Sequence, residues 1–450
     1  MKRALHFEAD FGPGVGAGHV MRCLALAEAW RRHEGPTTLR TPSPLTSYLA
    51  QRAGELETTI ITDGRSVSAD WIVLDSYRVG VERQHELSEG AMLMVVDDHH
   101  HQPEYVAQMV LDQNLGAELY GYDSASIECL LGPSFALLRD EFRRARSRSK
   151  HIGEVRRILV TLGGDPPAAL INAVRTAIAS VAPAASVDVA AGARSDMVEL
   201  MAGADLAVAA AGTTAWELCC MGVPSLLIPI AENQRPVAEA LARHGSAIST
   251  SMATVEADLA AVIADATLRS GLATSASQLV DGRGASRVVA AMRARSLAVR
   301  AAATDDAQVL FDWANESDTR SQSFNATPIA WDDHVQWLAD TLANPRRALC
   351  VVSDADRPIG QVRVDLGDGA AVIGISIDRS VRGTGLGPAV LRAGARWARQ
   401  RLGWTGPVDA WIKPTNAASE QTFSLAGFAP AGEGLQSGFE ALRYRDAGDG

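Results

Sequence analysis

Short apolar runs alternate with amphipathic helical stretches over residues 1–290. This alternation predicts βαβ units built on parallel sheets. Buried strands are expected at 5–9, 71–75, 92–97, 157–162, 186–190, 206–210 and 225–228, with a first helix at 20–32 and a segment crossing between two lobes at 130–142. The pattern therefore predicts two α/β lobes, with a ligand in the cleft between them at the carboxyl ends of the strands.

The pattern changes after Gly282, where the segment GRGASRVVAAMRARSLAVRAAATDD is rich in Ala and Arg and predicts a final helix followed by a linker. Helices come next, then antiparallel strands at 348–353, 360–366 and 371–377, a Gly-rich loop and a helix at 388–401. We therefore expect an α/β chain that ends in an α+β domain, with domains at 1–148, 149–297 and 304–446.

The amino-acid composition argues against some classes of binding partner. The 450 residues carry 42 basic and 53 acidic side chains, a net charge of −11, which argues against general affinity for nucleic acid or an anionic membrane. The five cysteines include no C-x-x-C pair, which is typical of free thiols in a reducing compartment. No apolar run reaches the ~20 residues of a membrane-spanning helix. A soluble, cytoplasmic protein is expected.

A glycine-rich loop follows the first predicted strand, with Gly14, Gly16 and Gly18 ahead of His19 and Arg22. Glycines let the backbone approach a phosphate or sugar closely, and the N–H groups of the following helix favour an anion. The same helix start disfavours imidazolium, so His19 would stay neutral and suit a general base. A turn with a helix-capping histidine explains the same residues.

A second strand, glycine turn and helix start is predicted at Gly212, Thr213 and Thr214. Backbone N–H groups and threonine hydroxyls at such a start can hold a diphosphate. Glu217 lies one turn further on, where a carboxylate suits a ribose diol. The spacing Thr214-x-x-Glu217 is also that of a capping box, and both roles remain open.

Other loops are expected at the same edge of the sheets. Gly163 follows one predicted strand, and Asn233 and Gln234 follow another, where they could bind sugar hydroxyl or amide groups. Asp75 and Asp98 end strands of the first lobe, where each either faces the cleft or caps the next helix.

The run His99 to His101 resembles a metal cluster. Adjacent loop residues point in different directions and rarely share one ion, so the sequence favours a loop beside the sugar and no metal.

A third glycine-rich loop lies between the predicted strand 371–377 and the helix 388–401. A pyrophosphate fits against glycine N–H groups at a helix start, with an arginine adding charge. The residues expected to take part are Ile377, Arg382, Gly383, Thr384, Gly385 and Gly387. A dinucleotide site has similar glycines, but no parallel repeat follows here.

Six stretches in order resemble one family: GAGHVMRCLALAEAW from Gly16, VLDSY from Val73, VVDDHH from Val95, LLGPSFALLRDEF from Leu130, VTLGGDPP from Val160, and AAGTTAWELCCMGVPSLLIPIAENQ from Ala210. They resemble the UDP-sugar hydrolases of pseudaminic acid biosynthesis, relatives of the GT-B glycosyltransferases of peptidoglycan assembly. The resemblance implies a GT-B-like pair of Rossmann-type lobes. It also implies release of UDP from a 2,4-diacetamido-2,4,6-trideoxy-β-L-altropyranosyl donor, without a metal.

The same resemblance implies site roles. His19 matches the base that activates water for attack on the anomeric carbon. The residues expected to contact the UDP-sugar are Gly16, Gly18, Arg22, Gly163, Gly212, Thr213, Thr214, Glu217, Asn233 and Gln234.

The pattern R-x-x-G-x-G from Arg382 resembles the acetyl-CoA loop of the GNAT superfamily of N-acetyltransferases, and Asn416 with Phe423 behind it resembles that superfamily's second motif. The resemblance covers residues 300–445 and implies acetyl-CoA as co-substrate, with Asn416 at the cofactor. Phe423 replaces a frequent tyrosine that protonates the leaving thiolate, so the acid is unassigned. His334 is a candidate base, although a structural histidine fits the same helical pattern.

Together the resemblances imply a bifunctional enzyme. Acetylation of the 4-amino group of a UDP-4-amino-4,6-dideoxy-N-acetyl-altrosamine would precede hydrolysis of the product to free sugar and UDP. Two rival interpretations remain: a GT-B glycosyltransferase with an accessory acetyltransferase, and a non-catalytic protein that binds nucleotide-sugar or acyl-CoA.

Overall fold

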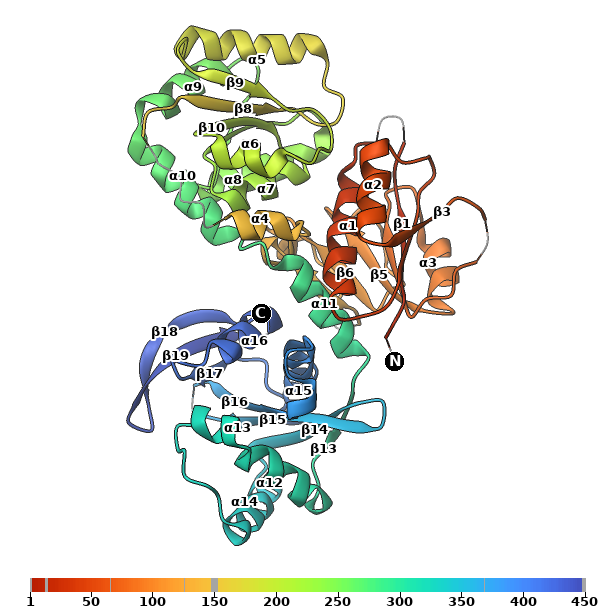
Figure 1. Cartoon of the computed structure of the whole chain (residues 1–450), viewed down its shortest axis with the longest axis vertical. Helices are drawn as coiled ribbons and strands as arrows, with labels where there is room; N and C mark the ends of the chain where they lie inside the picture. The colour runs from red at the N-terminus through yellow and green to blue at the C-terminus, as the bar shows by residue number, and fades with distance from the viewer. Residues whose placement is uncertain are drawn as a thin grey trace. The chain divides into compact units, whose positions relative to one another are not determined.

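A computed structural model describes residues 2–12, 15–64, 66–124, 126–146, 153–367 and 369–446. The chain divides into two compact units, Met1–Ala285 and Ser286–Gly450. The first unit holds two parallel sheets and the second holds one mixed sheet (Figure 1). Gly14 and the predicted domain boundary between 148 and 149 lie outside the described residues.

The first sheet has seven parallel strands in the order β3-β2-β1-β4-β5-β6-β7. They are β1 (Leu5–Ala9), β2 (Thr37–Arg40), β3 (Thr58–Ile61), β4 (Trp71–Asp75), β5 (Met92–Asp97), β6 (Met109–Asp112) and β7 (Glu128–Leu131), with helices α1 (Gly18–Arg31), α2 (Ser47–Glu55) and α3 (Val81–Ser88) between them. The strand order reverses at β1, which pairs with both β2 and β4. In such sheets ligands bind outside the carboxyl ends of the strands at this switch point.

The second sheet is also parallel, in the order β12-β11-β10-β8-β9. Its strands are β8 (Arg157–Thr161), β9 (Ser186–Val189), β10 (Leu206–Ala210), β11 (Ser225–Ile228) and β12 (Ile248–Ser249), and its helices are α5 (Ala168–Val181), α6 (Met197–Gly203), α7 (Thr213–Met221), α8 (Arg235–His244), α9 (Val255–Ala264) and α10 (Ala266–Leu279). The switch point lies between β8 and β10. The predicted pair of Rossmann-type lobes is confirmed.

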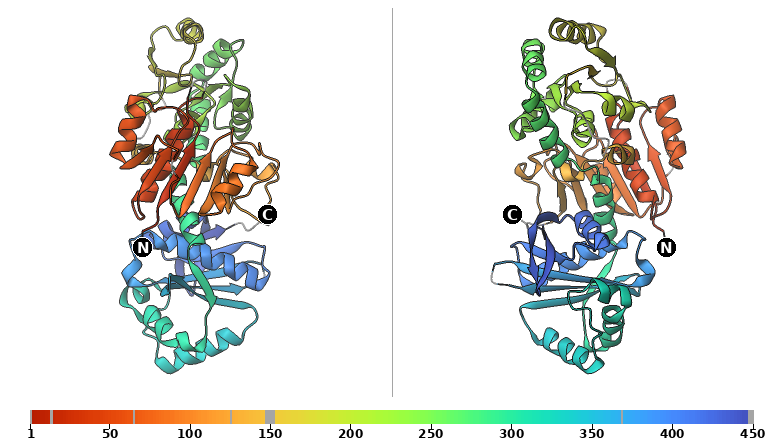
Figure 2. Two further views of the ribbon diagram at one scale, coloured as in Figure 1. Left: turned by 90° about the vertical axis from the view of Figure 1, so that its right-hand side faces the viewer. Right: turned by 60° about the vertical axis from the view of Figure 1, so that its left-hand side comes forward.

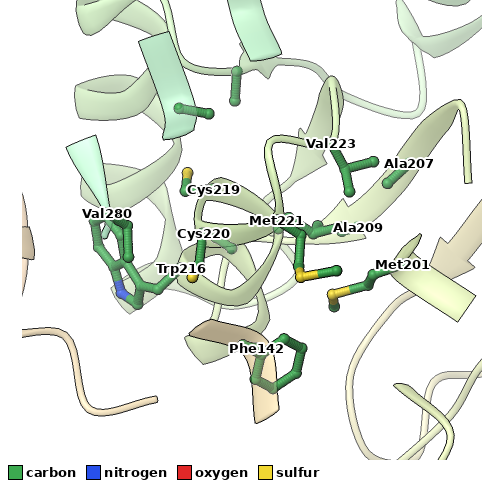
Figure 3. Packing of buried hydrophobic residues seen from close by; sticks show 14 of the residues in the cluster. Phe142, Met201, Ala207, Ala209, Trp216, Cys219, Cys220, Met221, Val223 and Val280 are labelled. Atoms are coloured by element: carbon green, nitrogen blue, oxygen red, sulfur yellow. The ribbon is translucent and has the colours of Figure 1, made fainter. Parts of the chain in front are cut away.

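The predicted crossing segment is more structured than expected. Its first residues belong to β7, and its end forms α4 (Asp140–Ala145). Phe142 of α4 is fully buried in the core of the second lobe, together with Met201, Trp216 and Met221 (Figure 3). The connection is therefore part of that hydrophobic core.

Helix α11 (Gly284–Arg295) confirms the predicted helix, but the linker predicted after it is wrong. Ala298–Ala301 form strand β13, which pairs antiparallel with β14 (Arg347–Asp354). Ala294 and Leu297, which we placed in the second lobe, pack in the core of the second unit. An edge strand is held by backbone hydrogen bonds to its neighbour, and four small or polar residues give no strand pattern.

The mixed sheet of the second unit has the order β13-β14-β15-β16-β17-β19-β18. Its other strands are β15 (Arg357–Leu366), β16 (Ala371–Ile377), β17 (Val408–Ile412), β18 (Ala429–Gln436) and β19 (Phe439–Asp446), and its helices are α12 (Ala307–Asn315), α13 (Ser317–Gln322), α14 (Trp331–Ala343), α15 (Leu386–Leu402) and α16 (Ala417–Ala426). Alternate residues of β14 face opposite ways. Cys350 packs with α15, and Val351 packs with α12 and α14 on the other face. Figure 2 shows these helices on opposite sides of the sheet. The predicted α+β domain is confirmed. In the described part of the chain, no helix is both long enough and apolar enough to cross a membrane.

Phe142 tests the role of the connection between the lobes. We expect Phe142→Ala to lower the free energy of unfolding by about 3–5 kcal/mol, because it leaves a cavity in the core. Phe142→Leu keeps most of the apolar volume and should cost less. Leu119→Ala, at a side chain that is 83% exposed, should change it by less than ~0.5 kcal/mol. Chemical denaturation of the full chain measures all three. Phe142→Ala behaving like Leu119→Ala would contradict the assignment.

Candidate active sites

His19 lies in the first turn of α1, just after the loop from β1. Its Nδ1 is 2.5 Å from Oδ1 of Asp75, the last residue of β4. Strand β4 pairs with β1, so the switch point of the sheet brings these two residues together. Because Asp75 holds Nδ1 and thereby orients the ring, Nε2 is the nitrogen left for exchange of a proton with a substrate or water.

Arg22, one turn along α1, holds the other side of the Asp75 carboxylate. Its Nε and Nη2 donate to Asp75 over 2.5 and 2.6 Å, and Nη1 donates to Asp98 over 2.8 Å. The Arg22 side chain is 3% exposed. We expected Arg22 to contact substrate, and this is wrong: its guanidinium is enclosed by two carboxylates. Burial alone would raise the pKa of Asp75, but Arg22 and His19 hold it well below its usual range. Asp75 therefore stays ionised and can stabilise a positively charged His19.

Tyr77 was not singled out by the sequence analysis, although it ends the VLDSY stretch. Its ring packs edge-on against His19, with 5.0 Å between ring centroids. Its hydroxyl donates to Asp98, which also accepts from Arg22. Burial, and then the charge of Asp98, raise the pKa of Tyr77. Tyr77 is thus a protonated residue fixed beside the candidate base.

His99 and His101 both pack against the Tyr77 ring and against each other, so the expectation that the three successive histidines point in different directions holds only for His100. His101 Nδ1 is 2.5 Å from Asp97, and the His100 ring packs against Tyr122 at 4.9 Å. His99 is exposed at the edge of the Tyr77 ring. Within the described ranges, no three or more His, Cys, Asp or Glu side chains are grouped so that they could hold a metal ion.

Asp112, at the end of β6, is a buried carboxyl that sequence reasoning missed. Its neighbour in the β5–β6 register is Asp97, and the Tyr122 hydroxyl lies 2.9 Å from Asp112 and 3.1 Å from Asp97. Burial, and then the charges of Asp98 and Asp97, raise the pKa of Asp112 from 3.8 to about 7. Since one hydroxyl has one hydrogen, a proton on Asp112 supplies the second hydrogen bond of this group.

In the second lobe, Gly212 is the N-cap of α7, and Thr213 and Thr214 are its first two residues. No side chain caps this helix start. The capping-box interpretation is therefore wrong, because Thr214 already lies inside the helix. Glu217 is half-buried and its Oε1 is 3.5 Å from Nη2 of Arg139. Burial raises the pKa of Glu217, and Arg139 opposes that shift.

The two glycine turns of the first unit lie side by side. A Cβ atom at Gly18 would be 3.3 Å from Cγ2 of Thr213, so the starts of α1 and α7 touch. Gln234 Nε2 would be 3.7 Å from a Cβ at Gly212. These contacts bring four predicted substrate residues, Gly18, Gly212, Thr213 and Gln234, together at the helix start that follows β10.

The other predicted substrate residues, Gly16, Gly163 and Asn233, lie in separate segments, and no contact between them is seen in the described residues. Gly163, after β8, has a φ of +97° and faces Ile230, whose Cδ1 would be 3.3 Å from a Cβ there. Asn233 is exposed. Among the described residues, a Cβ at Gly16 would meet no atom within 4 Å, so a ligand has room beside this glycine.

In the second unit, the predicted pyrophosphate loop precedes α15. Gly383 and Gly385 have φ values of +74° and +73°, a left-handed conformation that favours glycine, and Gly385 is the N-cap of α15. Thr384, between them, donates its hydroxyl to the carbonyl of Val381 over 2.6 Å. The loop thus turns backbone N–H groups toward the start of a 17-residue helix, an arrangement that suits an anion.

Arg382 is held inside the unit. Its guanidinium is 2.7 Å from Oε2 of Glu316 and 3.0 Å from Oγ1 of Thr319, and its Nε donates to the carbonyl of Ile377 over 3.1 Å. We expected its charge to serve the pyrophosphate directly. In the structure Arg382 joins the end of β16 to α13 and its side chain is 32% exposed. Its direct contact with a pyrophosphate stays a prediction.

Three other residues of the second unit have structural contacts. Asn416 caps α16 by accepting from the N–H of Ser419 over 3.0 Å. Phe423 is buried against Phe428. His334 is buried, its Nε2 lies 2.9 Å from the carbonyl of Ala307, and burial lowers its pKa, which favours the structural interpretation over a base.

Strands β16 and β17 are parallel and pair only at Ala371↔Val408 and Val372↔Asp409. The rest of β16, up to Ile377, pairs with β15 alone. The backbone of β16 next to the pyrophosphate loop therefore has one edge that β17 does not cover.

Comparison with known families agrees with this division. Residues 296–429 match the acetyltransferase (GNAT) domain, and residues 189–288 match the glycosyltransferase family 28 C-terminal domain. These two segments are thus similar to a GNAT acetyltransferase domain and to the C-terminal domain of family 28 glycosyltransferases. The fold is a GT-B-like pair of lobes followed by a GNAT domain.

Individual relatives are distant. The spore coat polysaccharide biosynthesis protein SpsG of Bacillus subtilis is 24% identical over 332 residues, which cover 63% of this chain and 96% of SpsG. The structure of AAC(6')-Ib in complex with ribostamycin and coenzyme A is 21% identical, covering 34% of this chain and 93% of that one, with a TM-score of 0.31. Spermidine N-acetyltransferase from Vibrio cholerae, in complex with CoA and spermine, is 17% identical, covering 34% of this chain and 96% of that one, with a TM-score of 0.32.

Asp112 gives the first lobe a pH-dependent stability. Its folded-state pKa of about 7 lies above the usual 3.8, so the folded state binds more protons than the unfolded state between these values. Its contribution is therefore complete below pH 4 and is lost as the pH rises through 7. We expect the unfolding free energy of wild type, relative to Asp112→Asn, to fall between pH 5 and pH 8. Denaturation at both pH values measures this, with Asp356→Asn, at an exposed turn residue, as control. A difference that is constant with pH would contradict it.

Proposed function

We propose that the first unit hydrolyses a UDP-sugar to UDP and free sugar. The observation that carries this proposal is the His19–Asp75 pair, which stands at the start of α1, against the glycine turn of α7. One helix start supplies a general base and the adjacent one supplies N–H groups suited to a diphosphate.

The chemistry follows from these positions. Nε2 of His19 takes a proton from water as the water oxygen bonds to the anomeric carbon of the sugar. The bond from that carbon to the diphosphate oxygen breaks, and its electron pair leaves with UDP. Asp75 stabilises the positive charge that develops on His19, and the N–H groups of Thr213 and Thr214 stabilise the charge on the diphosphate.

The identities of the nucleotide and of the sugar are further parts of this proposal. Glu217 is placed one turn inside α7 for a ribose diol, where the substrate would replace or share its contact with Arg139. In this proposal Gln234 and the exposed Asn233 bind the sugar. The resemblance to hydrolases of pseudaminic acid biosynthesis supports a 2,4-diacetamido-2,4,6-trideoxy-β-L-altropyranosyl group, and the distant likeness to SpsG supports a role in sugar biosynthesis.

The second unit acts as an acetyl-CoA-dependent N-acetyltransferase on an amino sugar nucleotide in this proposal. The loop from Gly383 to Gly387 fits the diphosphate of coenzyme A, and the uncovered edge of β16 fits an extended thioester arm. The amine nitrogen bonds to the thioester carbonyl carbon, the carbon–sulfur bond breaks, and the amine loses a proton to water. Phe423 has no proton to give, so the leaving thiolate takes one from solvent.

The two reactions combine into one sequence. Acetylation of the 4-amino group would produce the diacetamido UDP-sugar that the first unit hydrolyses.

His19→Ala and Asp75→Asn test the first unit. With the diacetamido UDP-sugar and no other acceptor, wild type should release UDP, and His19→Ala should be slower by about 10²–10⁴-fold, the usual contribution of a general base. Asp75→Asn should also be slow, because the amide neither holds the charge on His19 nor pairs with Arg22. The dissociation constant of UDP should change little in His19→Ala.

The matched control is His85→Ala, at an exposed histidine of α3. Release of UDP only after an acceptor is added would favour a glycosyltransferase. A wild-type chain that binds the UDP-sugar and releases no UDP under either condition would favour a binding protein.

Gly385→Val tests the second unit. A β-branched residue is strained at φ +73°, so the loop should rearrange. Acetyl transfer from acetyl-CoA to the 4-amino UDP-sugar, followed through the released thiol, should fall at least tenfold, about the factor for one charged hydrogen bond. UDP release from the diacetamido sugar should stay at the wild-type rate. Gly369→Val, at a glycine with open space around its Cβ position and no positive φ, is the control. An unchanged acetylation rate would contradict the placement of coenzyme A.

A further inference from the structure

Helix α11 contacts the loop of the proposed acetyl-CoA site and helix α16. Nη1 of Arg293, in its last turn, donates to the backbone carbonyl of Thr384 over 3.1 Å. Nε of Arg287 donates to the carbonyl of Ser424, on α16, over 3.1 Å. Both arginines are buried, Arg293 at 4% exposure. Buried guanidinium groups are rare unless they are hydrogen-bonded. These hydrogen bonds therefore hold both arginines in fixed positions within the unit.

The bond to Thr384 fixes the direction of one peptide group. The carbonyl of Thr384 and the N–H of Gly385 belong to the same planar trans peptide and point in opposite directions. Gly383 and Gly385 flank it with positive φ values, and glycine restricts the backbone least. By holding the carbonyl, Arg293 directs the N–H of Gly385 away from α11, at the N-cap of α15, where an anion is favoured.

Arg293 lies outside the part of the chain that matches the GNAT domain, which begins at residue 296. It comes from the helix that joins the two units and whose last residues, with Ala294 and Leu297, pack in the core of the second unit. The residue that donates to the loop therefore lies before the matched domain in the sequence.

We propose that Arg293 is a positioning residue for the diphosphate of acetyl-CoA. It acts through the Thr384–Gly385 peptide, and its positive charge behind the loop adds to the attraction for the diphosphate. This inference rests on the proposed acetyl-CoA-dependent function of the second unit.

The test compares two acetyl donors in the full-length chain. S-acetylpantetheine has the thioester arm but lacks the diphosphate, so it does not use the loop. We expect Arg293→Gln to raise the KM for acetyl-CoA about tenfold, the factor expected for the loss of one charged hydrogen bond. The kcat/KM for S-acetylpantetheine should stay within about twofold. Arg293→Lys, which keeps the charge but not the fork of donors, should recover part of the loss.

The matched control is Arg399→Gln. Arg399, at the far end of α15, is 10% exposed in its side chain, and it donates to the carbonyl of Gly406 over 2.8 Å. Arg399→Gln should leave the ratio of kcat/KM for acetyl-CoA to kcat/KM for S-acetylpantetheine unchanged. An Arg293→Gln chain that loses both donors equally, or that shifts the ratio no more than Arg399→Gln does, would overturn the proposal and show a purely structural role.

Calorimetric titration of wild type and of Arg293→Gln with coenzyme A separates the positioning role of Arg293 from the proposed function of the second unit. Wild type that binds coenzyme A while Arg293→Gln binds it equally well would overturn the positioning role alone. Wild type that does not bind it would overturn the proposed function of the second unit, and this inference with it.

Discussion

The carboxylate of Asp75 is the interaction on which the first unit's candidate chemistry depends. It is fully buried at the end of β4, and it accepts two hydrogen bonds from Arg22 while its Oδ1 lies 2.5 Å from His19. A buried carboxylate without such partners would be costly. The pairing therefore fixes the start of α1 against the end of β4, and it orients the base at the switch point of the sheet. Tyr77 and Asp98 extend the same network to the next strand.

The two candidate sites use glycine-containing helix starts in different ways. In the first unit, charged side chains surround the start of α1, whereas backbone groups, threonines and the Gln234 amide lie at the start of α7. In the second unit, Arg382 and Arg293 both bind protein groups, Glu316 and the carbonyl of Thr384. Their hydrogen bonds shape the backbone of the loop, and the proposed anion site consists of N–H groups of the main chain. Arginines near an anion site can thus act through the protein and need not touch the ligand.

The sequence predicted those elements whose residues are apolar in a continuous run. Strands β4, β5, β10 and β11 lie at the predicted residues, because parallel strands buried on both faces are mostly apolar. Strands β1 and β16 were also predicted, although β1 contains His6 and Glu8 and β16 is only partly buried. Strand β2 was missed because Thr37–Arg40 contains one apolar residue, and β13 was missed because four residues are too short a run to separate from a linker. Both are held by pairing with their neighbours. Strands β3, β6, β12, β17, β18 and β19 were not predicted either, although β6 is a short apolar run. The candidate base was found from its glycine loop. Its partner Asp75 was only one of several aspartates at strand ends, because the pairing depends on which strands lie side by side. For the same reason Arg22 was assigned to the substrate, when two carboxylates from separate strands enclose it.

The central claim is that His19 directs water to the anomeric carbon. It is tested most directly by hydrolysing the diacetamido UDP-sugar in ¹⁸O-labelled water and measuring the mass of the released UDP by mass spectrometry. The account predicts that UDP forms without an acceptor and carries no ¹⁸O, because the broken bond is the one between the sugar carbon and the diphosphate oxygen. UDP that carries ¹⁸O on its terminal phosphate would show attack at phosphorus and would contradict the roles assigned to His19 and Asp75.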